Sequence, residues 1–125
     1  MKETVFTENA PAPIGPYSQG MLASGQFIFV SGQLPVANGV IVGSTISEQA
    51  VQSLKNVEAI LTAGGYTWDN VVKTTVYLKN MDDFAAMNAE YSKIVTGPNY
   101  PARVAFQVGK LPLDVLVEIE AIAVK

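Results

Sequence analysis

The stretch VLVEIEAIAV (Val115–Val124) decides which fold this chain can adopt. Alternate side chains of a strand lie on the same face, and the odd-numbered positions here are all apolar, so this face should pack against helices. The even-numbered face mixes Glu118 and Glu120 with aliphatic side chains. A sheet that faces water usually carries polar residues on its open side, so we expect this second face to pack against another subunit. A long loop that covers the face is the alternative.

The segments upstream of this strand predict a layered α+β protein. Runs of β-branched and aromatic residues between turn signals give the strand positions, and Ser24-Gly25 predicts a hairpin between the first two main strands. The predicted strands are Tyr17–Ala23, Gln26–Ser31, Val71–Leu78, Arg103–Val108 and Val115–Val124, with short additional strands at Val5–Thr7 and near Val40–Val42. With two helices between them, the order is β-β-α-β-α-β-β. We expect a six-stranded mixed sheet with both helices on one face.

Two helices are predicted from capping and periodicity. Thr45 and Glu48 have the spacing of a capping box at the start of the first helix, and Gly64-Gly65 ends it. Its apolar side chains recur at helical spacing at Val51, Leu54, Val57 and Leu61. Asp82 or Asp83 caps the second helix. The core face of that helix carries Phe84, Met87 and Tyr91.

Composition limits the chemistry that the chain can perform. Its 125 residues, of which 49% are hydrophobic and 15% charged, fit one domain over residues 1–125 with a substantial core. The chain has no histidine and no cysteine. This excludes nucleophiles activated by histidine and zinc sites built from His or Cys. Asp82-Asp83 is the only adjacent acidic pair and is typical of a helix start, so we expect no metal site.

The charge pattern argues against nucleic acid and membrane partners. The formal net charge is −3 and no short window is basic, whereas phosphate binding needs a basic face. No stretch approaches the roughly 18 apolar residues of a membrane span. The N-terminal residues Met1–Val5 lack the apolar core of an export signal. We therefore expect a cytoplasmic protein that binds neither nucleic acid nor a membrane.

Arg103 is the only arginine, and it lies in an apolar strand, PARVAFQV (Pro101–Val108). Strand alternation places Ala105 on its face and Val104 on the other. A guanidinium offers paired, planar donors that match the two oxygens of a carboxylate. One interpretation is therefore a carboxylate-binding arginine. The other is a buried ion pair between Arg103 and a glutamate that fixes strand register.

Glu118 is the acidic residue that could accompany Arg103. The connection Gly109–Asp114 is short enough for an antiparallel hairpin, and pairing Val108 with Leu113 brings Arg103 opposite Glu118 on the open face of the sheet. There, Glu118 could act on a proton or a water molecule beside a bound carboxylate. Its alternative role is that of the ion-pair partner.

Five motifs in order along the chain resemble those of the Rid family, also called the YjgF family, of reactive-intermediate deaminases. The motifs are Ile14–Gly20, Ser31–Pro35, Val72–Leu78, Phe84–Tyr91, and a C-terminal signature made of Tyr100–Arg103, Leu111-Pro112 and Val117–Ala123. The resemblance implies a chorismate-mutase-like fold and a homotrimer with ligand sites between subunits. It also implies hydrolysis of short 2-enamino or 2-imino acids, such as 2-aminoacrylate, to 2-keto acids and ammonia without a cofactor. A non-catalytic sensor of small carboxylates and a nuclease are the alternatives.

The resemblance carries over residue by residue to the following positions. Arg103 matches the arginine that clamps the substrate carboxylate, and Glu118 matches the acid that positions or activates water. Tyr17 matches a tyrosine near the reacting centre, although a packing role after Gly-Pro is the alternative.

Four further positions of the resemblance concern the pocket walls. Ser31 and Gly32 match a strand end that lines the pocket, and Asn88 matches a helix residue near it; their alternative roles are an ordinary strand end and an exposed helix turn. Ala105 stands where the family often has cysteine. Water can attack an imine carbon without a thiolate, and Ala105 can still offer its backbone N–H to the carboxylate. This departure puts the substrate preference in doubt, because it shrinks one wall of the pocket.

Overall fold

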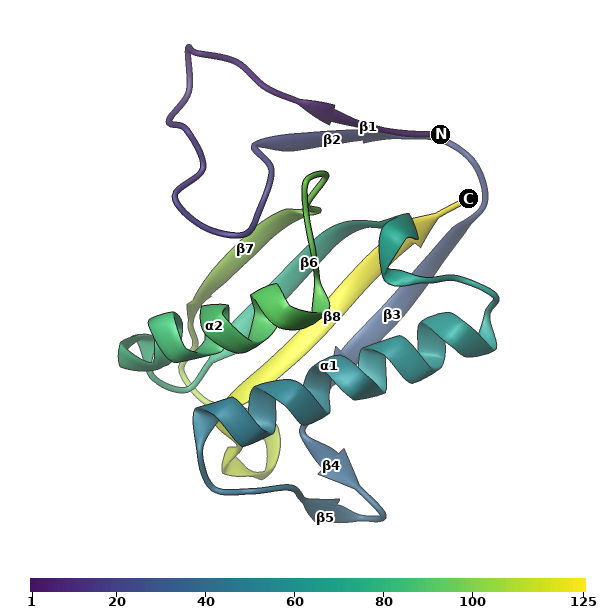
Figure 1. Ribbon diagram of the computed structural model, residues 1–125. Helices are drawn as coiled ribbons and strands as arrows, with labels where there is room; N and C mark the ends of the chain where they lie inside the picture. The colour runs from purple at the N-terminus through teal and green to yellow at the C-terminus, as the bar shows by residue number, and fades with distance from the viewer.

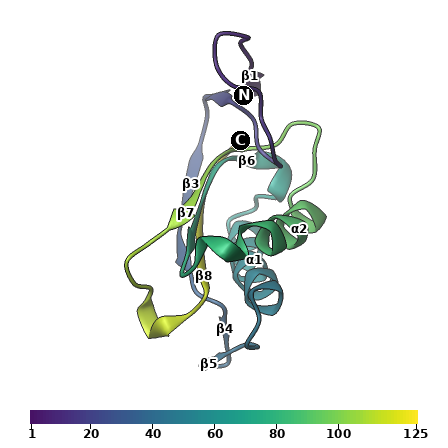
Figure 2. The same cartoon turned by 90° about the vertical axis from the view of Figure 1, so that its left-hand side faces the viewer.

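The computed structural model describes all 125 residues and has two helices packed on one face of a four-stranded mixed sheet (Figures 1 and 2). In spatial order, the sheet contains β3 (Phe27–Gln33), β8 (Val117–Val124), β6 (Val71–Leu78) and β7 (Ala102–Gln107). The helices are α1 (Ile46–Ala63) and α2 (Phe84–Ile94). Short 3-10 turns lie at Trp68–Asn70, Met81–Asp83 and Pro112–Asp114. No helix is long and apolar enough to cross a membrane.

The remaining strands form two small ribbons, which corrects the expected six-stranded sheet. β1 (Lys2–Val5) pairs with β2 (Gly20–Ala23), and β4 (Val36–Ala37) pairs with β5 (Val40–Ile41). The β1–β2 ribbon meets the edge of the main sheet beside β7, through a single bridge between Ser18 and Ala102.

The expected hairpin across Ser24-Gly25 does not form. β2 pairs with β1, and β3 pairs instead with β8 at the far end of the sequence. This long-range pairing buries Val30 and half-buries Ile28 beneath α1. A turn signal shows where the chain reverses direction, but burial decides which strand becomes the neighbour.

The order of the last three main strands also differs from the expected one. β7 runs parallel to β6, to which it is connected through α2, and β8 is antiparallel to both β6 and β3. β6 therefore lies between β7 and β8, so these two strands cannot form the expected hairpin. The connection between β7 and β8, residues 108–116, instead passes the end of β6.

The core lies between the helices and one face of the sheet. The odd-numbered side chains of β8 are all buried there, as their alternation predicts. The other main contributors are Leu54, Val57 and Leu61 of α1, Met87 and Tyr91 of α2, and Val76 and Leu78 of β6. Each fully buried aliphatic side chain of this kind stabilises the fold by roughly 1.5–3 kcal/mol.

The start of α1 confirms the predicted capping box. Thr45 Oγ1 accepts a hydrogen bond from the Glu48 N–H at 3.2 Å, and the Glu48 carboxylate accepts one from the Thr45 N–H at 3.3 Å. The hydrogen bond from the Thr45 hydroxyl, with two from backbone N–H groups, lowers the pKa of Glu48. α2 begins after Asp83, which is its N-cap residue but makes no side-chain capping bond.

Figure 2 shows that the face of the sheet opposite the helices is uncovered. Exposed apolar side chains lie on this face. The exposed apolar groups come from β3 and β7 more than from β8. Phe29 is 72% exposed, and Phe27, Val104 and Phe106 are each more than two-fifths exposed. On β8 itself, Glu118, Glu120 and Ile122 are half-buried.

Candidate functional site

Arg103 lies on β7, the edge strand of the sheet, with its side chain turned toward α2. Its Nη1 donates a hydrogen bond to Asn88 Oδ1 at 2.7 Å. Three aromatic rings surround the guanidinium. Its central carbon is 4.8 Å from the centre of the Tyr91 ring, 5.5 Å from that of Tyr17 and 5.7 Å from that of Phe84. Such ring faces attract a cation without neutralising it.

No carboxylate pairs with Arg103. The ion pairs of the chain are Lys79 with Asp114 and Lys93 with Glu90. The interpretation of Arg103 as half of a buried ion pair is therefore wrong within this chain. Burial lowers the pKa of Arg103, although a guanidinium stays protonated in proteins. A half-buried cation whose only hydrogen-bond acceptor is a neutral amide is suited to bind an anion.

A hydrogen bond to a buried threonine fixes the position of Tyr91. Its hydroxyl and Thr74 Oγ1 lie 2.8 Å apart, and both residues are fully buried. Burial raises the pKa of Tyr91, against the smaller effects of Thr74 and Arg103, so the phenol stays neutral. The ring that faces the guanidinium is thus fixed in orientation by the core.

Tyr17 reaches Arg103 from a loop that is tied to the start of β7. The N–H of Ser18 donates to the Pro101 carbonyl at 3.1 Å, and Ser18 Oγ donates to the Tyr100 carbonyl at 2.5 Å. The backbone of the loop comes close to the guanidinium at Gly15, where an added Cβ would lie 3.6 Å from Arg103 Nη2. The loop therefore forms one wall of the arginine site.

Glu118 lies on the other face of the sheet, beside the end of β3. A Cβ added at Gly32 would overlap the Glu118 carboxylate, so the backbone of this strand end lies directly against that side chain. Ser31 is exposed next to it. Nearby on the same face, the Tyr77 hydroxyl donates to Glu120 at 3.0 Å, and burial together with this acid raises the pKa of Tyr77.

The predicted site residues thus fall into two groups, which lie on opposite faces of the sheet within one chain. Arg103, Asn88, Tyr17 and Ala105 share the helix side of the sheet near β7. The expected register between Arg103 and Glu118 is wrong, because Arg103 pairs with Thr74 while Glu118 pairs with Tyr77 on the far side of β6. Ser31 and Gly32 lie with Glu118.

Sequence reasoning missed the part that Phe84 and Tyr91 take in the arginine site, since it assigned both to the core. The available signal was spacing, because residues 84 and 91 lie on the same face of the helix as Asn88. Thr74 carried no signal at all. Residues that could hold a metal ion do not gather anywhere, since no three His, Cys, Asp or Glu side chains converge.

The chain is a small α+β protein in which a half-buried arginine, bonded to a neutral amide and unpaired with any acid, lies between β7 and α2. Residues 7–125 match the family model described as Endoribonuclease L-PSP. The chain is 55% identical to a RutC family protein of Pyrococcus horikoshii, over 100% of this chain and 99% of the relative. It is 48% identical to the 2-iminobutanoate/2-iminopropanoate deaminase of Escherichia coli strain K12, again over 100% and 99%. The chain therefore belongs to the Rid (YjgF) family.

Solved structures agree with this assignment. The YjgF gene product of Escherichia coli is 45% identical, covers 98% of each chain and has a TM-score of 0.73. Escherichia coli TdcF, solved with bound serine, is 40% identical over 98% of each chain, also with a TM-score of 0.73. These neighbours share the α+β arrangement of two helices over a mixed sheet.

Proposed function

We propose that this protein hydrolyses short 2-enamino and 2-imino acids to 2-keto acids and ammonia. The observation that carries the proposal is Arg103, a half-buried cation that hydrogen-bonds only to the neutral Asn88 and has no acidic partner. Its remaining N–H groups suit a small carboxylate. Two kinds of relative support this chemistry, since one is named a 2-iminobutanoate/2-iminopropanoate deaminase and another was solved with serine, itself a small carboxylate.

The complete site is formed between subunits of a homotrimer in this proposal. A small substrate cannot touch Arg103 and Glu118 of one chain, because these side chains lie on opposite faces of the sheet. A second copy can supply the missing half. The exposed apolar side chains of β3 and β7 on the open face are of the kind that subunit interfaces bury.

The proposed reaction needs only groups that the chain carries. A 2-enamino acid first tautomerises to the imine, and Arg103, oriented by Asn88, binds the carboxylate. Glu118 of the neighbouring subunit takes a proton from water as the water oxygen adds to the imine carbon. The proton passes to nitrogen and gives a carbinolamine. Glu118 then carries the proton of the carbinolamine hydroxyl to nitrogen, the carbon–nitrogen bond breaks, and ammonia leaves together with a 2-keto acid.

The other predicted residues border the substrate. Tyr17 lies against the guanidinium and closes the site near the reacting carbon, while Ser31 and Gly32 line the side that carries Glu118. Ala105 shares the face of Arg103 on an edge strand, where its backbone N–H can support the carboxylate. Its small side chain leaves room for the substrate's own side chain.

Ammonia release from enzymatically generated 2-aminoacrylate, with and without the protein, tests the proposed function. We expect a clear acceleration that Arg103→Lys reduces by roughly tenfold or more, because a point charge cannot replace the paired donors. Circular dichroism and size exclusion should show that the variant keeps its fold. Equal rates with and without the wild-type protein would favour a sensor of small carboxylates over an enzyme.

The endoribonuclease named in the family description is not supported by the composition. A net charge of −3 and the lack of any basic stretch of sequence argue against attraction of a phosphate backbone, and the chain has no histidine for acid–base cleavage.

A further inference from the structure

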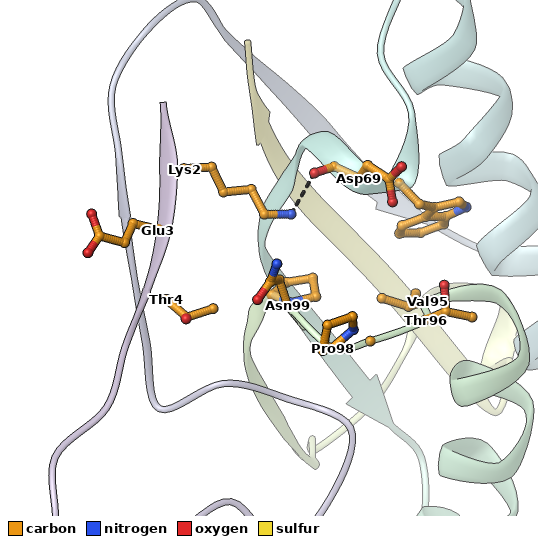
Figure 3. Close-up of a pocket in the computed structure, with 11 residues that line it drawn as sticks. Lys2, Glu3, Thr4, Asp69, Val95, Thr96, Pro98 and Asn99 are labelled. Atoms are coloured by element: carbon orange, nitrogen blue, oxygen red, sulfur yellow. Dashed lines mark hydrogen bonds between the residues drawn. The ribbon is translucent and has the colours of Figure 1, made fainter.

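A second cavity lies away from the arginine site, between the N-terminal ribbon and the connection from α2 to β7 (Figure 3). Its volume is about 470 Å³, which lies within the usual range for small-molecule sites. β1, the 3-10 turn at Trp68–Asn70 and the loop Val95–Asn99 provide its walls. None of the residues assigned to the proposed hydrolysis lines it, and its nearest approach to them along the chain is Pro101, two residues before Arg103.

The cavity contains an ammonium group that has no ionic partner. Lys2 Nζ donates to the backbone carbonyl of Asp69 at 2.5 Å and makes no other hydrogen bond. No carboxylate oxygen lies within 4.0 Å of it. Burial lowers the pKa of Lys2, and the charge of Asp69 partly opposes this effect. Two of the three donors of the ammonium group thus remain free.

A carboxylate in the same cavity is also unpaired. Asp69 is an exposed residue at the rim of the cavity; its carboxylate takes part in no ion pair and accepts no hydrogen bond within the chain, while its backbone carbonyl accepts the hydrogen bond from Lys2. Two opposite charges therefore line one cavity without touching each other. Glu3 also contributes to the lining, but strand alternation places its side chain opposite to those of Lys2 and Thr4, and it points away in Figure 3.

The rest of the wall combines the polar residues Thr4, Thr96 and Asn99 with apolar groups. The indole of Trp68 is fixed by a hydrogen bond from its Nε1 to Glu58 at 2.8 Å. Pro98 and Val95 lie opposite on the loop after α2. A ligand that fits this arrangement carries a negative and a positive group side by side and a short apolar side chain.

We propose that this cavity binds a free α-amino acid as its zwitterion. The ammonium group of Lys2 binds the ligand's carboxylate, and the carboxylate of Asp69 binds the ligand's ammonium group. The ligand's side chain packs against Trp68 and Pro98. The site differs in kind from the arginine site, where the protein offers a cation without a neighbouring acid.

Trp68 makes the proposal directly testable, because it is the only tryptophan of the chain and lines the cavity. We would titrate L-valine, 3-methylbutanoate, which lacks the ammonium group, and isobutylamine, which lacks the carboxylate, at constant ionic strength. Tryptophan fluorescence and the single indole N–H resonance report occupancy. The same titrations in Arg103→Ala remove the other carboxylate site from the measurement.

We expect L-valine to give a saturable change in both proteins, with an affinity at least about tenfold higher than that of either analogue. Lys2→Met and Asp69→Asn should each weaken valine binding about tenfold or more. Lys110→Met and Glu3→Gln serve as matched controls and should leave binding unchanged, because Lys110 lies outside the cavity and Glu3 points away from it.

Four results would overturn the proposal. Equal binding of valine and 3-methylbutanoate would reduce the cavity to a simple anion site. Loss of the valine response in folded Arg103→Ala would assign the response to the arginine site. Unchanged valine binding in Lys2→Met, or no response in fluorescence, resonance position or calorimetric heat, would show that the charges lining the cavity do not form a site.

Discussion

Arg103 is surrounded by neutral groups, so a charge on its neighbour at position 88 should determine whether Arg103 can bind a ligand carboxylate. Asn88→Asp is nearly isosteric and would place a carboxylate at the 2.7 Å hydrogen bond to Nη1. We expect the new ion pair to compete with a ligand carboxylate and to weaken binding of a 2-keto acid such as pyruvate by about tenfold or more. Calorimetry with pyruvate measures this, and thermal unfolding should show no loss of stability. Unchanged affinity would place the carboxylate site away from Arg103.

Glu118→Gln separates an enzyme from a sensor. Glutamine keeps the shape of the side chain but cannot take a proton, so imine hydrolysis should fall by on the order of 10²-fold. Pyruvate binding should persist, because Arg103 still holds the carboxylate. Ammonia release and calorimetry on the same preparations give the two readouts. A variant as active as the wild type would remove Glu118 from the mechanism and leave Tyr17 as the next candidate.

Gly32→Ala tests the role of Glu118 in a second way, because it displaces the Glu118 carboxylate without replacing an ionisable side chain. The added methyl would overlap the Glu118 carboxylate, which is the mobile end of a flexible side chain and can move aside. We therefore expect little change in the unfolding temperature together with a marked loss of hydrolysis.

Single residues could be predicted well where their type was unusual. Arg103 stood out as the one arginine, and its contact with Asn88 agrees with the expected neighbourhood. Thr74 could not be predicted, because its role depends on a strand pairing and a helix position that are both set by tertiary packing.

The helices depend on local interactions, and α1 allows a quantitative test. Thr45→Ala removes the capping acceptor and should lower the free energy of unfolding by about 1 kcal/mol, or a few degrees in the unfolding temperature. The folded-state pKa of Glu48 lies below its ordinary value of 4.5. Its stabilising contribution is therefore present above that value and lost as pH falls through the lowered folded-state pKa.

Unfolding of wild type and Thr45→Ala across this pH range checks both points. The difference between the two proteins should shrink as Glu48 becomes protonated, because the Thr45 hydroxyl is the largest cause of its shift. A difference that stays constant down to low pH would mean that the two halves of the capping box act independently.

Helix positions were predictable to within a residue or two because capping and periodicity are encoded locally. Strand partners were not, because β3 with β8 and β6 with β7 are joined across long stretches of sequence. Local signals located the strands but assigned them the wrong neighbours, and this error placed Glu118 beside Arg103 in the expected sheet.

The whole molecule presents an apolar sheet face that should be covered by other copies. Light scattering coupled to size exclusion should report three times the 13.3 kDa chain mass. Phe29 is the most exposed aromatic of this face, so Phe29→Glu should produce monomers and, with them, loss of hydrolysis, while Phe6→Glu at an exposed position outside the main sheet should not. A wild-type monomer at micromolar concentration would contradict the shared site.

The position of β8 also has a consequence for how the chain is made. This strand follows the other three strands of the main sheet along the chain, yet it lies between β3 and β6 and contributes four buried side chains to the core face, Val117, Ile119, Ala121 and Ala123. Until the ribosome has released these residues, β3 has no partner and the helices have no complete surface to pack on. The nascent protein should therefore stay unfolded and vulnerable to proteases until residues 117–124 have left the ribosome, and then fold in one cooperative step.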